Sequence, residues 1–233
     1  MSAPLVFITG ASSGIGQALA ARYARAGWRL ALVARRADAL ETWCRAQGWP
    51  SGQWAVYGAD VRDVASITAA GRGCLERQGL PDVVIANAGI SVGVDSAEFD
   101  DLEVVRATFE TNNLGMAASF QPFLVPMRAR RAGTLVGIAS VAAIRGLPGH
   151  GAYCASKAGV VAYCESLRGE CRPHGVKVVT LLPGYVATPL TEGNRYAMPF
   201  LMSPEAFAER AFRAIGAATS YRVIPWPMGV VAK

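Results

Sequence analysis

The stretch Thr9-Gly10-Ala11-Ser12-Ser13-Gly14-Ile15-Gly16 follows an apolar run and opens a helical pattern. Backbone N–H groups at the start of a helix attract phosphate, and glycines let a phosphate approach closely and let the helix pack on the strand. The spacing is GxxxGxG instead of the commoner GxGxxG. Glycines also serve ordinary tight turns, but the strand–loop–helix context favours a bound dinucleotide. The loop therefore predicts cofactor contacts from Gly10, Ser12, Ser13, Gly14, Ile15 and Gly16.

Short β-branched runs alternate with helical patterns outward from this loop to the end of the chain. Several runs are apolar at every position, as in parallel strands covered on both faces. The pattern predicts the α/β class, with one doubly wound, Rossmann-like domain over residues 1–233 and a seven-stranded parallel sheet flanked by helices on both faces. The expected strands are 5–9, 29–34, 54–58, 83–86, 133–140, 176–182 and 222–225, and the expected helices 14–26, 38–47, 62–78, 101–130, 152–172 and 203–217.

Composition narrows the class of protein. Hydrophobic residues make up 52% of the 233 residues and charged residues 17%, which excludes a disordered chain. No apolar run approaches the roughly 18 residues that a membrane span needs, and residues 1–10 do not resemble a signal peptide. We therefore expect a soluble, cytoplasmic protein. Its cysteines have no CxxC spacing, so we expect reduced thiols and no metal site. They are Cys44, Cys74, Cys154, Cys164 and Cys171.

The net charge of +6 raises the question of a nucleic-acid partner. The basic residues are scattered, apart from Arg35-Arg36 and a short cluster over 128–131. A solvated surface with one phosphate pocket explains this distribution better than a DNA-binding face, so we expect no nucleic-acid partner.

The end of the second expected strand indicates which dinucleotide binds. An acidic residue there would bind the adenosine ribose and repel a 2′-phosphate. Here the strand ends Leu32-Val33-Ala34-Arg35-Arg36, without an acid and with two guanidinium groups. Arginine forms strong charge-assisted contacts with phosphate, so the pair predicts NADP(H), although two arginines can also merely solvate a loop.

A tyrosine and a lysine four residues apart, Tyr153 and Lys157, stand at the start of an expected helix. Side chains at this spacing share a helix face. A free tyrosine titrates near pH 10, and a nearby ammonium favours the phenolate, so we expect Lys157 to bring Tyr153 into the range of general acid–base work. Ser140 ends an apolar strand at the edge where parallel sheets bind ligands, and its hydroxyl is placed either to hold a substrate oxygen or only to cap a turn.

With these motifs in order, the chain resembles the short-chain dehydrogenase/reductase family, in its NADP-preferring branch. The resemblance runs from Thr9 to Arg222. Beyond the glycine loop, Ser140, Tyr153 and Lys157, it implies cofactor contacts from Asp60, Val61, Asn87, Ala88, Gly89, Pro183, Gly184, Val186 and Thr188.

The resemblance implies three further roles. Lys157 would also contact the nicotinamide ribose, and Tyr153 would contact the cofactor as well. Asn112 matches the helix asparagine that holds a water in the proton relay, with the neighbouring Asn113 as a register alternative. Ser13 is not the basic residue that other NADP users have in the glycine loop, so discrimination would depend mainly on Arg35, with help from Arg36.

The substrate side is less specific. The family shapes its pocket from segments that correspond to 141–151 and 189–202. The second is largely apolar and predicts a lid over a lipophilic carbonyl, although the same residues suit packing on the sheet. His150 is a further candidate contact, against the plainer interpretation of a loop histidine. The apolar end 225–228 suits either a pocket wall or a subunit contact.

The sequence thus predicts hydride transfer between NADP(H) and a ketone or aldehyde, with Asn112, Ser140, Tyr153 and Lys157 as catalytic residues. The substrate is a small carbonyl compound or alcohol, and we expect a homotetramer or homodimer. A sensor or scaffold that binds NADPH without turnover is the alternative, but such proteins usually lose the tyrosine or the lysine. A sugar-nucleotide epimerase or dehydratase is disfavoured by the chain length and the glycine spacing.

Overall fold

The computed structural model describes residues 3–194 and 197–233. Its strands form one fully parallel sheet in the order β3-β2-β1-β4-β5-β6-β7. Four strands, the first four of the chain, match the predicted bounds. The expected Rossmann-like fold class is confirmed. The strands are β1 (Leu5–Thr9), β2 (Arg29–Ala34), β3 (Trp54–Gly58), β4 (Val83–Ala86), β5 (Thr134–Ile138), β6 (Lys177–Pro183) and β7 (Tyr221–Ile224).

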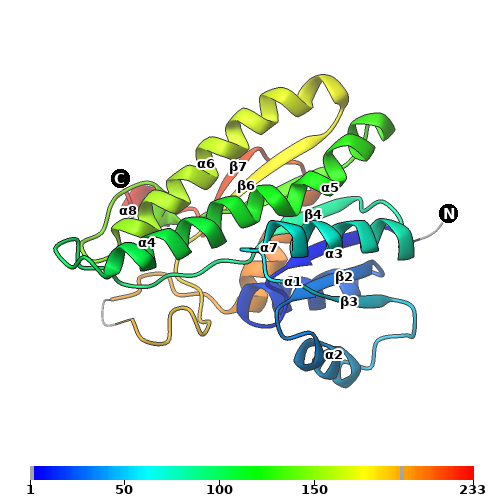
Figure 1. The fold of residues 1–233 in the computed structure, drawn as a ribbon, viewed down its shortest axis with the longest axis horizontal. Helices are drawn as coiled ribbons and strands as arrows, with labels where there is room; N and C mark the ends of the chain where they lie inside the picture. The colour runs from blue at the N-terminus through cyan, green and yellow to red at the C-terminus, as the bar shows by residue number, and fades with distance from the viewer. Residues whose placement is uncertain (1–2, 195–196) are drawn as a thin grey trace.

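Helices cover both faces of the sheet (Figure 1). The α-helices are α1 (Gly14–Arg25), α2 (Ala37–Ala46), α3 (Val64–Arg77), α4 (Asp101–Phe109), α5 (Gly115–Arg130), α6 (Gly151–Cys171), α7 (Pro204–Gly216) and α8 (Met228–Val231). Short helical turns of other types are η1 (Glu110–Leu114), η2 (Val141–Ala143) and η3 (Arg172–His174).

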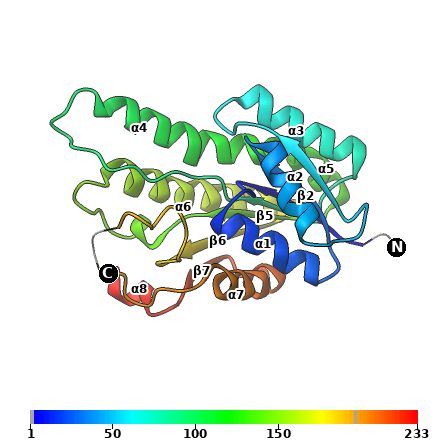
Figure 2. The ribbon, with the colours of Figure 1, turned by 90° about the horizontal axis from the view of Figure 1, so that it is seen from below.

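Successive side chains of the central strand β1 point to opposite faces of the sheet, and the hydrophobic core is divided into two parts accordingly. Val6 and Ile8 of β1 pack with α1, α2 and α7, whereas Leu5 and Phe7 pack with α3, α5 and α6. All four side chains are fully buried, since successive residues of a strand point to opposite faces. Figure 2 shows α1 and α7 on one side of the sheet and α3 and α4 on the other. The four consecutive apolar residues of β1 are therefore a consequence of two covered faces.

The strand order indicates where on the carboxyl edge of the sheet a ligand would bind. From β1 the chain moves outward to β2 and β3, then returns to pair β4 with the other side of β1. The carboxyl ends of β1 and β4 therefore lie side by side where the order reverses, which is the position at which open parallel sheets bind ligands.

One predicted helix is interrupted. The pattern over 101–130 indicated a single helix, but the structure has α4, a π-helical turn η1 and then α5. A π turn fits one additional residue without a glycine or proline to mark it, so apolar periodicity does not reveal it. Asn112 lies in this turn. The strand expected over 133–140 is also shorter, because Gly133 has a φ of +144° and Ser140 caps η2.

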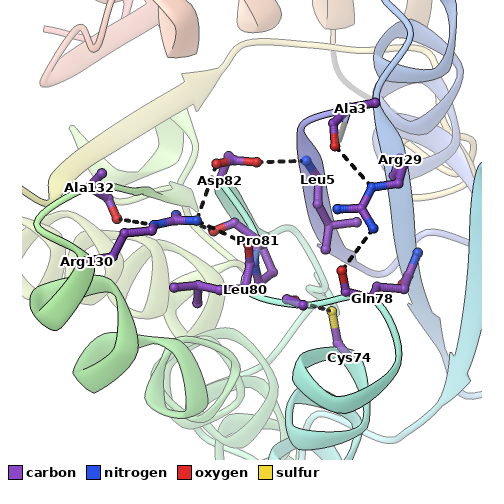
Figure 3. Close-up of polar contacts among 11 residues, drawn as sticks. Ala3, Leu5, Arg29, Cys74, Gln78, Leu80, Pro81, Asp82, Arg130 and Ala132 are labelled. Carbon is purple, nitrogen blue, oxygen red and sulfur yellow. Dashed lines mark hydrogen bonds and ion pairs between the residues drawn. The ribbon is translucent and has the colours of Figure 1, made fainter. Parts of the chain in front are cut away.

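A polar network ties the strands together at the opposite, amino edge of the sheet (Figure 3). The Asp82 carboxylate accepts the backbone N–H of Leu5 at 2.9 Å and pairs with Arg130 at 3.4 Å. Arg130 also donates to the carbonyls of Pro81 at 2.7 Å and Ala132 at 3.1 Å. The network joins the starts of β1, β4 and β5, so structural polar residues gather at one edge and leave the other for a site.

The described part of the chain contains no helix that is both long enough and apolar enough to cross a membrane.

Candidate active site

A cavity of about 1060 Å³ opens at the carboxyl edge of the sheet. It runs from the loop after β1 and the end of β2 to the residues after β5 and the start of α6. Almost all of the predicted site residues line it. Gly16, Arg36 and Asn112 do not. One continuous space thus joins the expected cofactor loop to the expected catalytic pair.

The glycine loop has the backbone shape that only glycine adopts easily. Gly10 and Gly14 have φ angles of +66° and +52°, in the left-handed region. Gly16 has a different role, since an added Cβ would lie 2.1 Å from the Gly10 carbonyl oxygen. Gly16 therefore allows α1 to pack against the loop, while Gly10 and Gly14 line the cavity. This cradle at the N-terminus of α1 fits a pyrophosphate.

Asn87 fixes the loop to the neighbouring strand. Its Nδ2 donates to the carbonyls of Thr9 at 3.1 Å and Gly10 at 3.2 Å. The Thr9 hydroxyl in turn accepts the backbone N–H groups of Asn87 and Ala88, at 3.1 and 3.2 Å. These bonds hold the ends of β1 and β4 in register at the point where the strand order reverses.

Charged groups gather at the end of the cavity beside β2 and β3. Arg35, Asp60 and Arg62 all line it. Arg62 bonds to both carboxylate oxygens of Asp60, and these hydrogen bonds, with a smaller contribution from the charge of Arg35, lower the pKa of Asp60. Arg36 immediately precedes α2, is exposed and lies outside the cavity lining. Sequence reasoning missed Arg62, although it directly follows the Asp60-Val61 motif.

The catalytic candidates Ser140, Tyr153 and Lys157 come together in the same cavity. Lys157 is 5% exposed, and its Nζ donates to the Ile138 carbonyl at 2.9 Å and lies 5.7 Å from the centre of the Tyr153 ring. The Ser140 hydroxyl is hydrogen-bonded to Tyr153 and also accepts the N–H of Ala142 at 3.1 Å. Ser140 therefore caps a turn and also faces the phenol, so its two interpretations do not exclude each other.

The pKa of Tyr153 departs from the sequence expectation. Burial raises it above its ordinary value, and the hydrogen bond with Ser140 acts in the opposite direction. Burial lowers the pKa of Lys157 to about 8. Both shifts disfavour the charged form, as expected when apolar surroundings outweigh attraction between the two groups. The phenol therefore stays protonated at neutral pH.

Asn112 connects the cavity wall to the catalytic helix. Its Oδ1 accepts the Ile90 N–H at 2.9 Å, and its Nδ2 donates to the Ile90 carbonyl at 3.0 Å and to the Ser156 hydroxyl at 2.9 Å. The Ser156 hydroxyl donates to the Tyr153 carbonyl at 2.8 Å. The buried side chain therefore holds the segment after β4 against the first turn of α6. Its neighbour Asn113 bonds to the Ser156 carbonyl instead.

Three segments form the remaining wall. Val141, Leu147 and His150 line the cavity from the segment after β5, and Leu190 and Pro199 from the expected lid. Within that lid Met202 is nearly buried and pairs with Val186, whereas Phe200 and Leu201 are about half exposed. The apolar residues of 189–202 thus divide between wall, core and surface. Arg195 and Tyr196, which also belong to the expected lid, lie outside the described residues.

The chain end supplies the third segment of this wall. Met228, Val231 and Ala232 line the cavity, so the end of the chain is a pocket wall at these positions. Arg145, which also lines the cavity, is hydrogen-bonded to the backbone carbonyl of Lys233. Tyr185, between two predicted residues, lines the cavity as well and was not singled out from the sequence. Among the described residues, no three His, Cys, Asp or Glu side chains are grouped as metal ligands would be.

Comparisons with known proteins agree with this geometry. A family profile described as short chain dehydrogenase matches residues 4–198. An uncharacterized oxidoreductase of Myxococcus xanthus is 36% identical over 99% of this chain and 90% of its own. A variant of actinorhodin polyketide ketoreductase, solved with NADPH, is 29% identical and covers 97% of each chain with a TM-score of 0.87. A 3-ketoacyl-(acyl-carrier-protein) reductase of Brucella melitensis, solved with NADH, is 26% identical over 94% of each chain with a TM-score of 0.84. The chain is therefore an oxidoreductase-type protein that belongs to the short-chain dehydrogenase family.

Proposed function

We propose that this protein is an NADP(H)-dependent oxidoreductase that reduces a lipophilic ketone or aldehyde to an alcohol, or catalyses the reverse reaction. The observation that carries the proposal is that Ser140, Tyr153 and Lys157 line the same cavity as the glycine loop. The positive φ angles of Gly10 and Gly14 and the volume of the cavity fit a dinucleotide that reaches from that loop to the phenol.

The residues divide the work in the reduction direction. A reduced nicotinamide, when bound, supplies a hydride to the carbonyl carbon. The Ser140 hydroxyl donates a hydrogen bond to the carbonyl oxygen, and the Tyr153 hydroxyl gives that oxygen a proton. The Lys157 ammonium stabilises the phenolate that Tyr153 then becomes, and it is held in place by its bond to the Ile138 carbonyl.

Asn112 is proposed to act on the path by which Tyr153 recovers its proton. Both ends of its side chain are used by Ile90 and Ser156. Its side chain would therefore fix the catalytic helix in place, and the water of a proton relay would be held beside it.

The preference for NADP(H) rests on Arg35. The guanidinium lines the cavity at the end of β2, where no carboxylate follows the strand. The two reductases described above were solved with NADPH and with NADH, so family membership alone does not choose between them. The other predicted cofactor residues that line the cavity would hold the pyrophosphate, the adenine and the nicotinamide along it.

The apolar wall supports a lipophilic substrate. Leu147, Leu190, Pro199, Met228 and Val231 surround the space beyond Ser140 and Tyr153. Burial of such side chains against an apolar ligand contributes roughly 25 cal/mol per Å² of surface removed from water. The two similar reductases, a polyketide ketoreductase and a 3-ketoacyl-(acyl-carrier-protein) reductase, support a carbonyl substrate here.

We also propose a cytoplasmic homo-oligomer that associates through α4 and α6. Leu102, Phe109 and Tyr163 on this face are each more than a third exposed. The five cysteines are all buried and free, which suits a reducing compartment.

The central test replaces Tyr153 by phenylalanine. We expect turnover of a responsive ketone or aldehyde to fall by several orders of magnitude, on the order of 10²–10⁴-fold for the loss of a general acid, with NADPH affinity nearly unchanged. Tyr221→Phe, which removes an exposed phenol on β7, is the matched control and should behave as the unaltered protein. Near-normal turnover in Tyr153→Phe would refute the assignment, whereas NADPH binding without turnover of any carbonyl by the unaltered protein would favour a sensor.

A second test concerns the cofactor. Arg35→Ala should weaken NADPH binding by about tenfold or more and leave NADH binding within about twofold, since only the phosphorylated cofactor loses a charge-assisted contact. Fluorescence titration with each cofactor measures this. An equal loss for both cofactors would mean that another group reads the 2′-phosphate.

A further inference from the structure

Arg62 makes the most extensive charged contact of any side chain in the cavity lining. Its Nη2 lies 2.7 Å from Asp60 Oδ2, and its Nε lies 3.2 and 3.1 Å from the two carboxylate oxygens. The Asp60 Oδ1 also accepts the Arg62 backbone N–H at 3.0 Å. Such a forked contact between a guanidinium and a carboxylate fixes the position of both groups.

The forked pair lies beside Arg35. The same end of the cavity is lined by Arg35, Asp60 and Arg62. The charge of Arg35 contributes to lowering the pKa of Asp60. Two guanidinium groups and one carboxylate give this end a net charge of about +1. Without Arg62 the carboxylate would offset Arg35, and the end would be neutral. Asp60 alone would repel a phosphate dianion, so some group has to compensate it if a 2′-phosphate binds here.

We propose that Arg62 is a second specificity residue for 2′-phosphorylated adenosine, acting by neutralising Asp60 beside Arg35. The inference rests on the proposed use of NADP(H). Arg35 and Asp60 alone would leave this end of the cavity neutral, so a third charged residue is needed to favour the phosphate. Asp60 keeps its implied contact with the cofactor, and Arg62 removes the penalty that its carboxylate imposes on the phosphate. Arg62 is a positioning residue in this account, since it acts through Asp60.

The expected effect is modest because the pair is partly exposed. The Arg62 side chain is 45% exposed and that of Asp60 29%, so solvent screens the charges. We expect loss of Arg62 to weaken binding of a 2′-phosphorylated ligand about tenfold and binding of the unphosphorylated ligand less than about twofold. The ratio of the two affinities is therefore the quantity to measure.

Isothermal titration of the whole chain with 2′,5′-ADP and with 5′-ADP tests this without any turnover. Arg62→Gln removes the charge and the fork, whereas Arg62→Lys keeps the charge and removes the fork. Arg45→Gln is the matched control, because Arg45 forms an exposed ion pair with Glu41 on α2, outside the cavity. It should leave both affinities unchanged.

The outcomes separate this inference from the function on which it rests. A tenfold fall in the affinity ratio for Arg62→Gln, with a smaller fall for Arg62→Lys, supports the inference. An unchanged ratio, or equal losses for both ligands, overturns it and leaves the NADP(H) proposal intact. If the unaltered chain binds both ligands equally, the preference for NADP(H) itself fails and the inference fails with it.

Discussion

Replacing Lys157 by methionine removes a buried ammonium and keeps a side chain of similar length. The side chain is 5% exposed, and its Nζ donates a hydrogen bond to the Ile138 carbonyl. Burial lowers its pKa to about 8, whereas a lysine in the unfolded chain titrates near 10.4. The two states of the chain therefore bind different numbers of protons over this range of pH.

The sign and size of the effect follow from that difference. Between about pH 8 and pH 10.4 the unfolded chain holds a proton that the folded chain has released, so the free energy of unfolding rises with pH. Between about pH 7.5 and pH 9.5 this contribution grows by about 2 kcal/mol in the unaltered protein. Lys157→Met lacks it. Buried thiols and phenols such as Cys74 and Tyr57, whose pKa burial raises to about 12, act in the opposite direction, but they are present in both proteins and cancel in the difference.

Urea unfolding followed by tryptophan fluorescence, at several pH values between about 7 and 10, measures this difference. We expect the stability of the unaltered protein relative to Lys157→Met to increase by about 2 kcal/mol over the interval. Lys177→Met, which removes an exposed lysine at the start of β6, is the matched control for the loss of an amine. A flat difference for Lys157→Met would show that the ammonium is solvated, and the reasoning about the catalytic pair would be wrong.

Two further substitutions test the architecture around the site. Gly16→Ala places a Cβ 2.1 Å from the Gly10 carbonyl oxygen. We expect NADPH affinity, measured by fluorescence titration, to fall at least about tenfold and the free energy of unfolding to fall by about 1–3 kcal/mol. Gly169→Ala is the control and should be neutral or slightly stabilising, because an added Cβ meets nothing within 4 Å there. Unchanged affinity in Gly16→Ala would contradict the packing role. Arg130→Ala removes the donor to the Pro81 carbonyl at the amino edge of the sheet. It should lower the free energy of unfolding in urea by about 1–3 kcal/mol without changing the KM for either substrate. A raised KM would show that the two edges of the sheet are coupled.

The parts of the fold that could be predicted are those where burial acts on every residue. Strands such as Leu5–Thr9 and Arg29–Ala34 are apolar apart from one terminal residue each, Thr9 and Arg29, because helices cover both faces, so their bounds follow from the sequence. The turn at Glu110–Leu114 could not be predicted, since it holds no glycine or proline to mark a break in the helical pattern. The last helix, Met228–Val231, is too short for periodicity to indicate.

The candidate site shows the same division. Every predicted site residue except Gly16, Arg36 and Asn112 lines the cavity, because residues at the carboxyl ends of parallel strands share one edge. Motif spacing did not predict the direction of the Tyr153 pKa, which depends on how far apolar atoms exclude water from the phenol. Arg62 was missed for a related reason: its importance comes from the conformation that brings it back onto Asp60.

The position of α8 has a practical consequence for anyone who produces this protein. Val231 and Ala232 line the cavity, so a peptide joined after Lys233 begins at the mouth of the pocket. An affinity tag there would compete with bulky ligands for space. Ala3, at the other end of the described chain, instead lies beside the amino edge of the sheet, where the start of β1 bonds to Asp82 (Figure 3). Assays of substrate range are therefore best made with the tag at the N-terminal side, or removed.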